Sequence, residues 1–128
     1  MTYWKESVAA ASVTEQPIHD GDGVIKRRSF FGNNVSLPVN FEVWELAPGA
    51  SEGDHTHAGA GALEEVYYFQ DGEGVVTVEG EEVPVAADDV VLVPAGVDHG
   101  VRNSGSTPLR LIILWGKPIP SKVQGGRR

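Results

Sequence analysis

Residues 49–72 constrain this chain more than any other stretch, because they combine closely spaced histidines with the pattern of a buried strand. The stretch contains His55-Thr56-His57, and Glu65 then opens the apolar run of residues 66–69. Side chains on a β-strand alternate between faces, so His55 and His57 should point the same way, about 6–7 Å apart along the chain. On a helix the same spacing would put them on nearly opposite sides. The stretch therefore predicts strands whose side chains are able to bind a metal.

A third histidine, His99, lies in the apolar run of residues 90–101. Three imidazoles and one carboxylate then form a mixed set of nitrogen and oxygen donors. The four residues are His55, His57, Glu65 and His99. Such a set suits iron, manganese, nickel, copper or zinc far better than magnesium or calcium. A divalent transition metal inside a β-barrel is therefore our working hypothesis, and the identity of the metal stays open.

Glu65 matters most for this hypothesis. It should share a strand face with Tyr67 and Phe69, and its carboxylate is buried if that face points inward. An unpaired buried charge is costly, on the order of several kcal/mol. A metal would offset that cost, and so would a proton or a hydrogen-bond network. We favour the metal because three of the four histidines lie in strand segments with suitable spacing, which leaves only His19 apart.

The composition excludes several other kinds of protein. The chain has 128 residues, enough for one domain with its own core. It has no cysteine, which excludes disulfides, thiolate ligands and a cysteine nucleophile. Its 10 basic and 18 acidic residues give a net charge of −8, which disfavours nucleic acid and anionic lipid as partners. The chain shows no signal peptide and no membrane span, so we expect a cytoplasmic protein.

Short β-branched and aromatic runs alternate with turns that contain glycine or proline, about every 8–12 residues. The expected strands are residues 24–31, 41–46, 64–69, 75–78, 82–85, 90–93, 97–102 and 109–115. This pattern predicts an all-β fold, either a sandwich or a barrel. We expect an N-terminal arm at residues 1–23, the barrel at residues 24–120 and a flexible C-terminal tail at residues 121–128.

Two segments resemble the motifs of the cupin family. Gly49-x5-His55-x-His57 with Glu65-x6-Gly72 resembles the first motif, and Pro94-x-Gly96-x2-His99-x3-Asn103 resembles the second. The resemblance covers residues 41–115 and implies a small single-domain cupin, which is a double-stranded β-helix (jelly-roll) barrel with the metal inside. It implies His55, His57, Glu65 and His99 as the metal ligands. The chain departs from the family pattern in the longer spacing between His57 and Glu65, and in Asp88, where the second motif normally begins with glycine.

The resemblance also bears on function. Four ligands on an octahedral metal leave about two positions open. Similar cupins include dioxygenases, decarboxylases, isomerases, lyases and cyclases. We therefore expect a metal-dependent enzyme that acts on a small oxygenated organic substrate by dioxygenase or lyase/isomerase chemistry. The alternative is a non-catalytic metal- or ligand-binding or sensing module.

Two further expectations concern Tyr67 and the assembly. Tyr67 should share the face of Glu65, which makes it the candidate catalytic acid or base, although simple packing inside the barrel would explain the same position. We also expect a homodimer, because exposed sheet edges tend to pair and the first twenty-odd residues have no clear place in the barrel.

Overall fold

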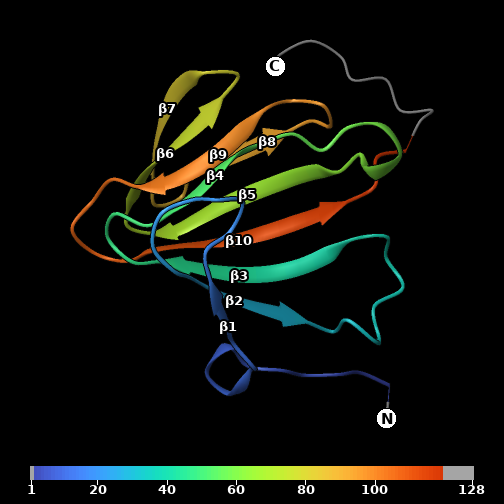
Figure 1. Cartoon of the computed structure of the whole chain (residues 1–128). Coiled ribbons are helices and arrows are strands. Elements are labelled where there is room, and N and C mark those ends of the chain that lie inside the picture. Colours follow the sequence, from blue (N-terminus) through green and yellow to red (C-terminus); the bar gives the residue numbers. More distant parts are fainter. Residues whose placement is uncertain (1, 120–128) are drawn as a thin grey trace.

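The computed structural model describes residues 2–119 and shows an all-β protein (Figure 1). Within these residues the chain forms ten strands and two short 3-10 turns, η1 (Val8–Ala10) and η2 (Gly59–Gly61). The strands are β1 (Thr14–Gln16), β2 (Ile25–Phe30), β3 (Asn40–Leu46), β4 (Ser51–His55), β5 (Glu64–Asp71), β6 (Glu73–Val78), β7 (Glu81–Ala86), β8 (Val90–Val93), β9 (His99–Asn103) and β10 (Leu109–Gly116). The tail expected at residues 121–128 lies outside the described residues.

The strands form two antiparallel sheets that face each other across the core, as Figure 1 shows. One sheet has six strands in the order β1-β2-β3-β10-β5-β8, and the other has four in the order β4-β9-β6-β7. Neighbours in each sheet are mostly far apart in sequence, because the chain passes from one sheet to the other several times. Two facing sheets with such crossings are typical of a jelly roll. The structure therefore confirms the predicted all-β fold.

The core lies between the sheets and follows the alternation of the sequence. In β10, Leu109, Leu111 and Ile113 are at most 2% exposed, whereas the residues between them are half-buried. In β5, Tyr67 and Phe69 are fully buried. Leu111 pairs with Phe69 and Ile113 with Tyr67, so the inward faces of the two strands coincide. Full burial of one such side chain contributes about 1.5–3 kcal/mol.

Two turns explain local departures from extended backbone. Glu79 and Gly80 have φ values of 50° and 80° between β6 and β7, as a two-residue hairpin turn requires. Asp88, which stands where the second cupin motif normally has glycine, has a φ of 73°. Glycine adopts this left-handed region freely, and aspartate is among the few residues that tolerate it. The Tyr68 hydroxyl also donates a hydrogen bond of 2.6 Å to the Asp88 carboxylate.

Residues 2–23 contact the barrel at several places. β1 extends the six-stranded sheet by pairing with β2. Further along, Ile18 is 7% exposed, forms a parallel bridge with Glu52, and accepts a hydrogen bond of 3.1 Å from the Gly53 amide. The part of the arm around Ile18 therefore lies along the edge of β4. Among the described residues, no helix is long and apolar enough to cross a membrane.

Candidate metal centre

The four residues singled out from the sequence meet at one end of the barrel. His55 is the last residue of β4 and pairs with His99, the first residue of β9. Glu65 projects inward from β5 in the facing sheet and is 7% exposed. The prediction that His55 and His57 share a strand is wrong, because β4 ends at His55. β9 begins at the partner of His55, so no strand remains to pair with residue 57, and the His57 carbonyl instead accepts a hydrogen bond of 2.9 Å from the Gly96 amide.

The rings nevertheless converge on a common space. The centroid of His55 lies 4.6 Å from that of His57 and 4.3 Å from that of His99. One donor atom from each of the four residues lies within 4.8 Å of all the others. Donor–metal bonds of about 2.0–2.2 Å allow opposite ligands to lie roughly 4.2 Å apart, so small side-chain shifts bring the set into bonding range. These residues could hold a metal ion.

Hydrogen bonds to the backbone leave the correct ring nitrogens free. Nδ1 of His55 lies 2.8 Å from the Gly53 carbonyl oxygen, and Nδ1 of His99 lies 2.9 Å from the Val97 carbonyl oxygen. A carbonyl only accepts, so in each ring Nδ1 carries the proton and donates it. In the neutral ring, which is the form that binds metals, Nε2 then presents its lone pair to the common space. In the protonated ring of His99, Nε2 instead donates to the Glu65 carboxylate. Nε2 of His55 is buried without a hydrogen-bond partner among the described residues, which fits a ring nitrogen that would bind a metal.

Glu65 is held by three neighbours. The hydroxyl of Tyr67 donates a short hydrogen bond to Glu65, and Nε2 of His99 lies 3.2 Å from the same carboxylate oxygen. Nε2 of His57 lies 3.4 Å from the other oxygen. Burial alone would raise the pKa of Glu65, but the hydrogen bonds from His99 and Tyr67 outweigh it and lower that pKa. Glu65 is therefore an anion inside the barrel, which suits it to bind a cation.

The same contacts also shift the pKa values of His99 and Tyr67. Burial lowers the pKa of His99, but the hydrogen bond to Glu65 outweighs burial and the resulting pKa is raised. Burial raises the pKa of Tyr67 well above its ordinary value, and Glu52 and Glu65 add to the rise. Tyr67 shares the face of Glu65, as expected, and its hydroxyl reaches the site. Its role as a catalytic acid or base stays a prediction.

The part of the chain that carries these four residues matches the profile of the cupin domain over residues 42–115. This chain belongs to the cupin domain family. Two features of its sequence depart from the family pattern without displacing the site. The longer spacing between His57 and Glu65 contains the 3-10 turn η2, and Glu65 still faces the three histidines. Asp88 supplies the left-handed backbone that glycine usually provides.

Curated relatives of this cupin include the oxalate-binding protein of Thermotoga maritima. It is 39% identical over 74 residues, which are 58% of this chain and 59% of that protein. The tetracenomycin polyketide synthase protein TcmJ of Streptomyces glaucescens is 37% identical over 68 residues, 53% of this chain and 44% of that protein. Each match spans less than two thirds of the relative's own length.

Solved structures share the cupin fold over a greater length. A protein of T. maritima described as a predicted oxalate decarboxylase has a TM-score of 0.80 at 26% identity, covering 88% of this chain and 97% of that chain. A polyketide cyclase of Streptomyces resistomycificus has a TM-score of 0.77 at 14% identity, covering 93% and 82% of the two chains. These likenesses confirm the cupin barrel that the sequence motifs predict.

Two residues beside the site were missed from the sequence. His19, set apart above as the spare histidine, stacks on His55 with ring centroids 3.6 Å apart and planes 15° apart. Glu52 is 4% exposed, and burial, with Glu65 nearby, raises its pKa to about 8. The pKa of His55 falls to about 4, chiefly through burial. No local pattern reveals these contacts. Glu52 and His55 are three residues apart, and it is the register shift between β4 and β9 that places them on the same side of β4.

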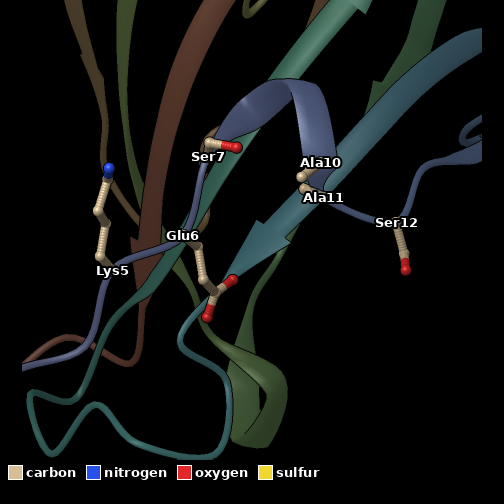
Figure 2. Close-up of a pocket in the computed structure, with 6 residues that line it drawn as sticks. All are labelled: Lys5, Glu6, Ser7, Ala10, Ala11 and Ser12. Atoms are coloured by element: carbon tan, nitrogen blue, oxygen red, sulfur yellow. The ribbon is translucent and has the colours of Figure 1, made fainter.

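An arginine and a surface hollow lie apart from the candidate metal centre. Arg110 alternates with the buried Leu109 and Leu111 and so points away from the core. A surface hollow of about 550 Å³ lies over η1, and Figure 2 shows its lining side chains around that turn. They are Lys5, Glu6, Ser7, Ala10, Ala11 and Ser12. This hollow contains none of the histidines and is separate from the candidate metal centre.

Proposed function

We propose that this chain binds one divalent transition metal through His55, His57, Glu65 and His99, and uses it to bind and activate a small oxygenated organic molecule. The observation that carries the proposal is the convergence of the four donor atoms within 4.8 Å of one another. Iron, manganese, nickel, copper and zinc all fit this set of nitrogen and oxygen donors. The reaction we propose is of the dioxygenase or the lyase/isomerase class.

The residues of the chain have distinct tasks in this proposal. His55 and His99 are oriented by their Nδ1 hydrogen bonds to backbone carbonyl groups, so that both Nε2 atoms face the centre. Glu65 supplies a negative charge to the ligand set. Tyr67 orients Glu65 and is placed to exchange a proton with a group bound beside it. A metal held here would polarise an oxygen atom of a bound carbonyl or carboxylate group.

A second candidate function is binding without turnover. It is favoured by the 39% identity to the protein of T. maritima that is named for binding oxalate. Three neutral imidazoles, one carboxylate and a divalent cation sum to one positive charge, which favours a small anion as the ligand. In this version the centre holds a compact acid such as oxalate and releases it unchanged.

Elemental analysis of protein purified without added metal or chelating resin tests the metal centre. We expect close to one transition metal per chain in the wild type and loss of that metal in His57→Ala and in Glu65→Ala. Glu81→Gln, which changes an exposed carboxylate, serves as the control. Absence of metal in the wild type, with no uptake on titration, would overturn the proposal.

An assay with oxalate distinguishes the enzyme from the non-catalytic binding module. The metal-loaded protein is mixed with oxalate, and both bound oxalate and released carbon dioxide or formate are measured. Binding without product supports the non-catalytic module for this ligand. Product that disappears in Glu65→Ala supports an enzyme. If neither binding nor product is seen, oxalate is not the ligand, and oxygen uptake and isomer formation with other small hydroxy acids and keto acids are measured next.

A further inference from the structure

A second group of metal-binding side chains adjoins the first. His19, Glu52 and His55 each place one donor atom within 4.8 Å of the other two. The Glu52 Oε2 atom lies 3.9 Å from Nε2 of His19 and also 3.9 Å from Nε2 of His55. The Glu52 side chain is only 3% exposed, whereas that of His19 is 39% exposed. The group therefore runs from the buried centre to the surface.

The distances between the donor atoms of this group fit a bound metal ion better than direct hydrogen bonds between the side chains. A separation of 3.9 Å is too long for a hydrogen bond. An ion midway between Oε2 of Glu52 and either histidine Nε2 would lie about 3.9/2, or roughly 2 Å, from both of those atoms, which matches metal–nitrogen and metal–oxygen bonds. The other carboxylate oxygen, Oε1 of Glu52, is buried without a hydrogen-bond partner among the described residues. A buried carboxylate without partners is costly unless something neutralises it.

The arm holds His19 in this position at some cost. His19 and Asp20 have φ values of 52° and 59°, in the left-handed region that few residues other than glycine adopt. The Gly21 amide donates to the Ile18 carbonyl at 3.0 Å, and the Ser51 amide donates to the Asp22 carbonyl at 2.8 Å. An added Cβ on Gly53 would overlap the His19 carbonyl oxygen, so the arm and β4 are in close contact. The ring is therefore directed over His55 by the fold.

His55 belongs to both groups but can serve only one ion at a time. Its Nδ1 is engaged with the Gly53 carbonyl, so only Nε2 can bind a metal. We propose that His19, Glu52 and His55 form an outer cation position through which a divalent transition metal enters and leaves the four-ligand centre. The metal keeps His55 as a ligand while it exchanges His19 and Glu52 for His57, Glu65 and His99. This inference rests on the proposed function, because it requires a metal at the inner centre.

Binding of cobalt(II), supplied as cobalt chloride to metal-free protein, tests the outer position directly. The double variant His57→Ala/Glu65→Gln removes two inner ligands and leaves the outer group intact. We expect this variant to bind one cobalt ion per chain in equilibrium dialysis. Adding either Glu52→Gln or His19→Gln should weaken that binding about tenfold or more. Adding Glu81→Gln, which alters an exposed carboxylate, should not. Near-ultraviolet circular dichroism of the tryptophans checks that each variant is folded.

Loading kinetics give a second measurement with the inner centre intact. In His19→Gln, which changes no carboxylate, we expect cobalt uptake and release both to slow about tenfold, with one ion still bound at equilibrium. Removing an intermediate on the path slows both directions, whereas loss of an inner ligand would speed release. Wild-type rates in His19→Gln, or a folded double variant that binds no cobalt, would overturn the inference alone. A wild type that binds no cobalt would overturn the proposed function as well.

Discussion

The guanidinium of Arg27 donates two hydrogen bonds to the same oxygen of Glu42, from Nε at 3.0 Å and from Nη2 at 2.9 Å. Glu42 is 2% exposed. The indole N–H groups of Trp44 and Trp115 also donate to its carboxylate, at 2.8 and 2.7 Å. Four N–H donors on β2, β3 and β10 thus share one buried charge, and they tie together three strands beside the candidate metal centre.

Arg27→Met should therefore destabilise the protein strongly. The variant keeps an apolar side chain of similar length but leaves Glu42 buried without its counter-charge, which should lower the free energy of unfolding by about 3–5 kcal/mol. Urea denaturation of the metal-free protein measures the loss. Adding Glu42→Gln should recover part of it. Arg102→Met is the matched control, because the Arg102–Glu82 pair is exposed and 3.7 Å long, and it should change stability by less than about 1 kcal/mol.

Tyr67→Phe should weaken metal binding without disturbing the fold. The substitution removes the hydroxyl that donates to Glu65 and keeps the buried ring. Loss of a group that orients a metal ligand typically lowers affinity about 10- to 100-fold. Competition with a chelating dye measures the dissociation constant. Tyr68→Phe, on the outer face of the same strand, should leave affinity unchanged. Equal affinities in wild type and Tyr67→Phe would mean that Tyr67 only packs in the barrel.

Glu52 should make the metal-free protein less stable as the pH rises. Its pKa is about 8 in the folded protein and near 4.5 when unfolded, since burial and the nearby Glu65 outweigh His99 and Arg27. Between these values the folded state holds a proton that the unfolded state has released. The free energy of unfolding should then fall by up to about 1.4 kcal/mol per pH unit.

Glu52→Gln should remove this dependence. Urea denaturation of both proteins, in the presence of chelator at several values between about pH 5 and about pH 8, isolates the contribution of Glu52 as the difference in slope. The neighbouring His19, His55 and Glu65 titrate in both proteins and largely cancel. Parallel slopes would show that Glu52 is ionised in the folded state.

Gly21→Ala should loosen the arm from β4. An added methyl group would overlap the Ser51 carbonyl oxygen, which belongs to the backbone and has little room to move. We expect a loss of about 1–3 kcal/mol in the free energy of unfolding and faster proteolysis of the arm. Gly32→Ala is the control, because nothing lies within 4 Å of its added methyl group. An arm that resists protease equally in both variants would contradict the close contact described here.

Dimerisation remains a proposal, and we propose that a second copy of the chain covers the outer face of β5 and β8. Tyr68, Val90 and Leu92 are 37%, 59% and 57% exposed there, and β8 is the edge of its sheet. Exposed apolar edge strands tend to pair with another chain. Light scattering at micromolar concentration should show a dimer for the wild type and a monomer for Leu92→Lys. Glu82→Lys, on an exposed position of the other sheet, should stay dimeric. A monomeric wild type would contradict this proposal.

Local patterns in the sequence were enough to predict the all-β fold and much of the candidate centre. Alternation in β5 placed Glu65, Tyr67 and Phe69 on one face, and the structure buries all three. This works because the two-residue period of a strand is a property of the backbone and does not depend on which strands pair. The same reasoning failed for His55 and His57, because β4 ends at His55, although the donor atoms of the three histidines and Glu65 do converge.

What the sequence alone determined was therefore most of the strands, their inward faces and the types of donor atom, whereas β1 and β4 were not among the expected strands. The tertiary structure decided the rest. It placed His57 in a loop, set Glu52 beside His55 through a register shift, and laid the ring of His19 on His55. These contacts join residues that are far apart in the chain or separated by an irregular pairing. They depend on how the arm and the sheets pack in space, and no period along the chain encodes that packing.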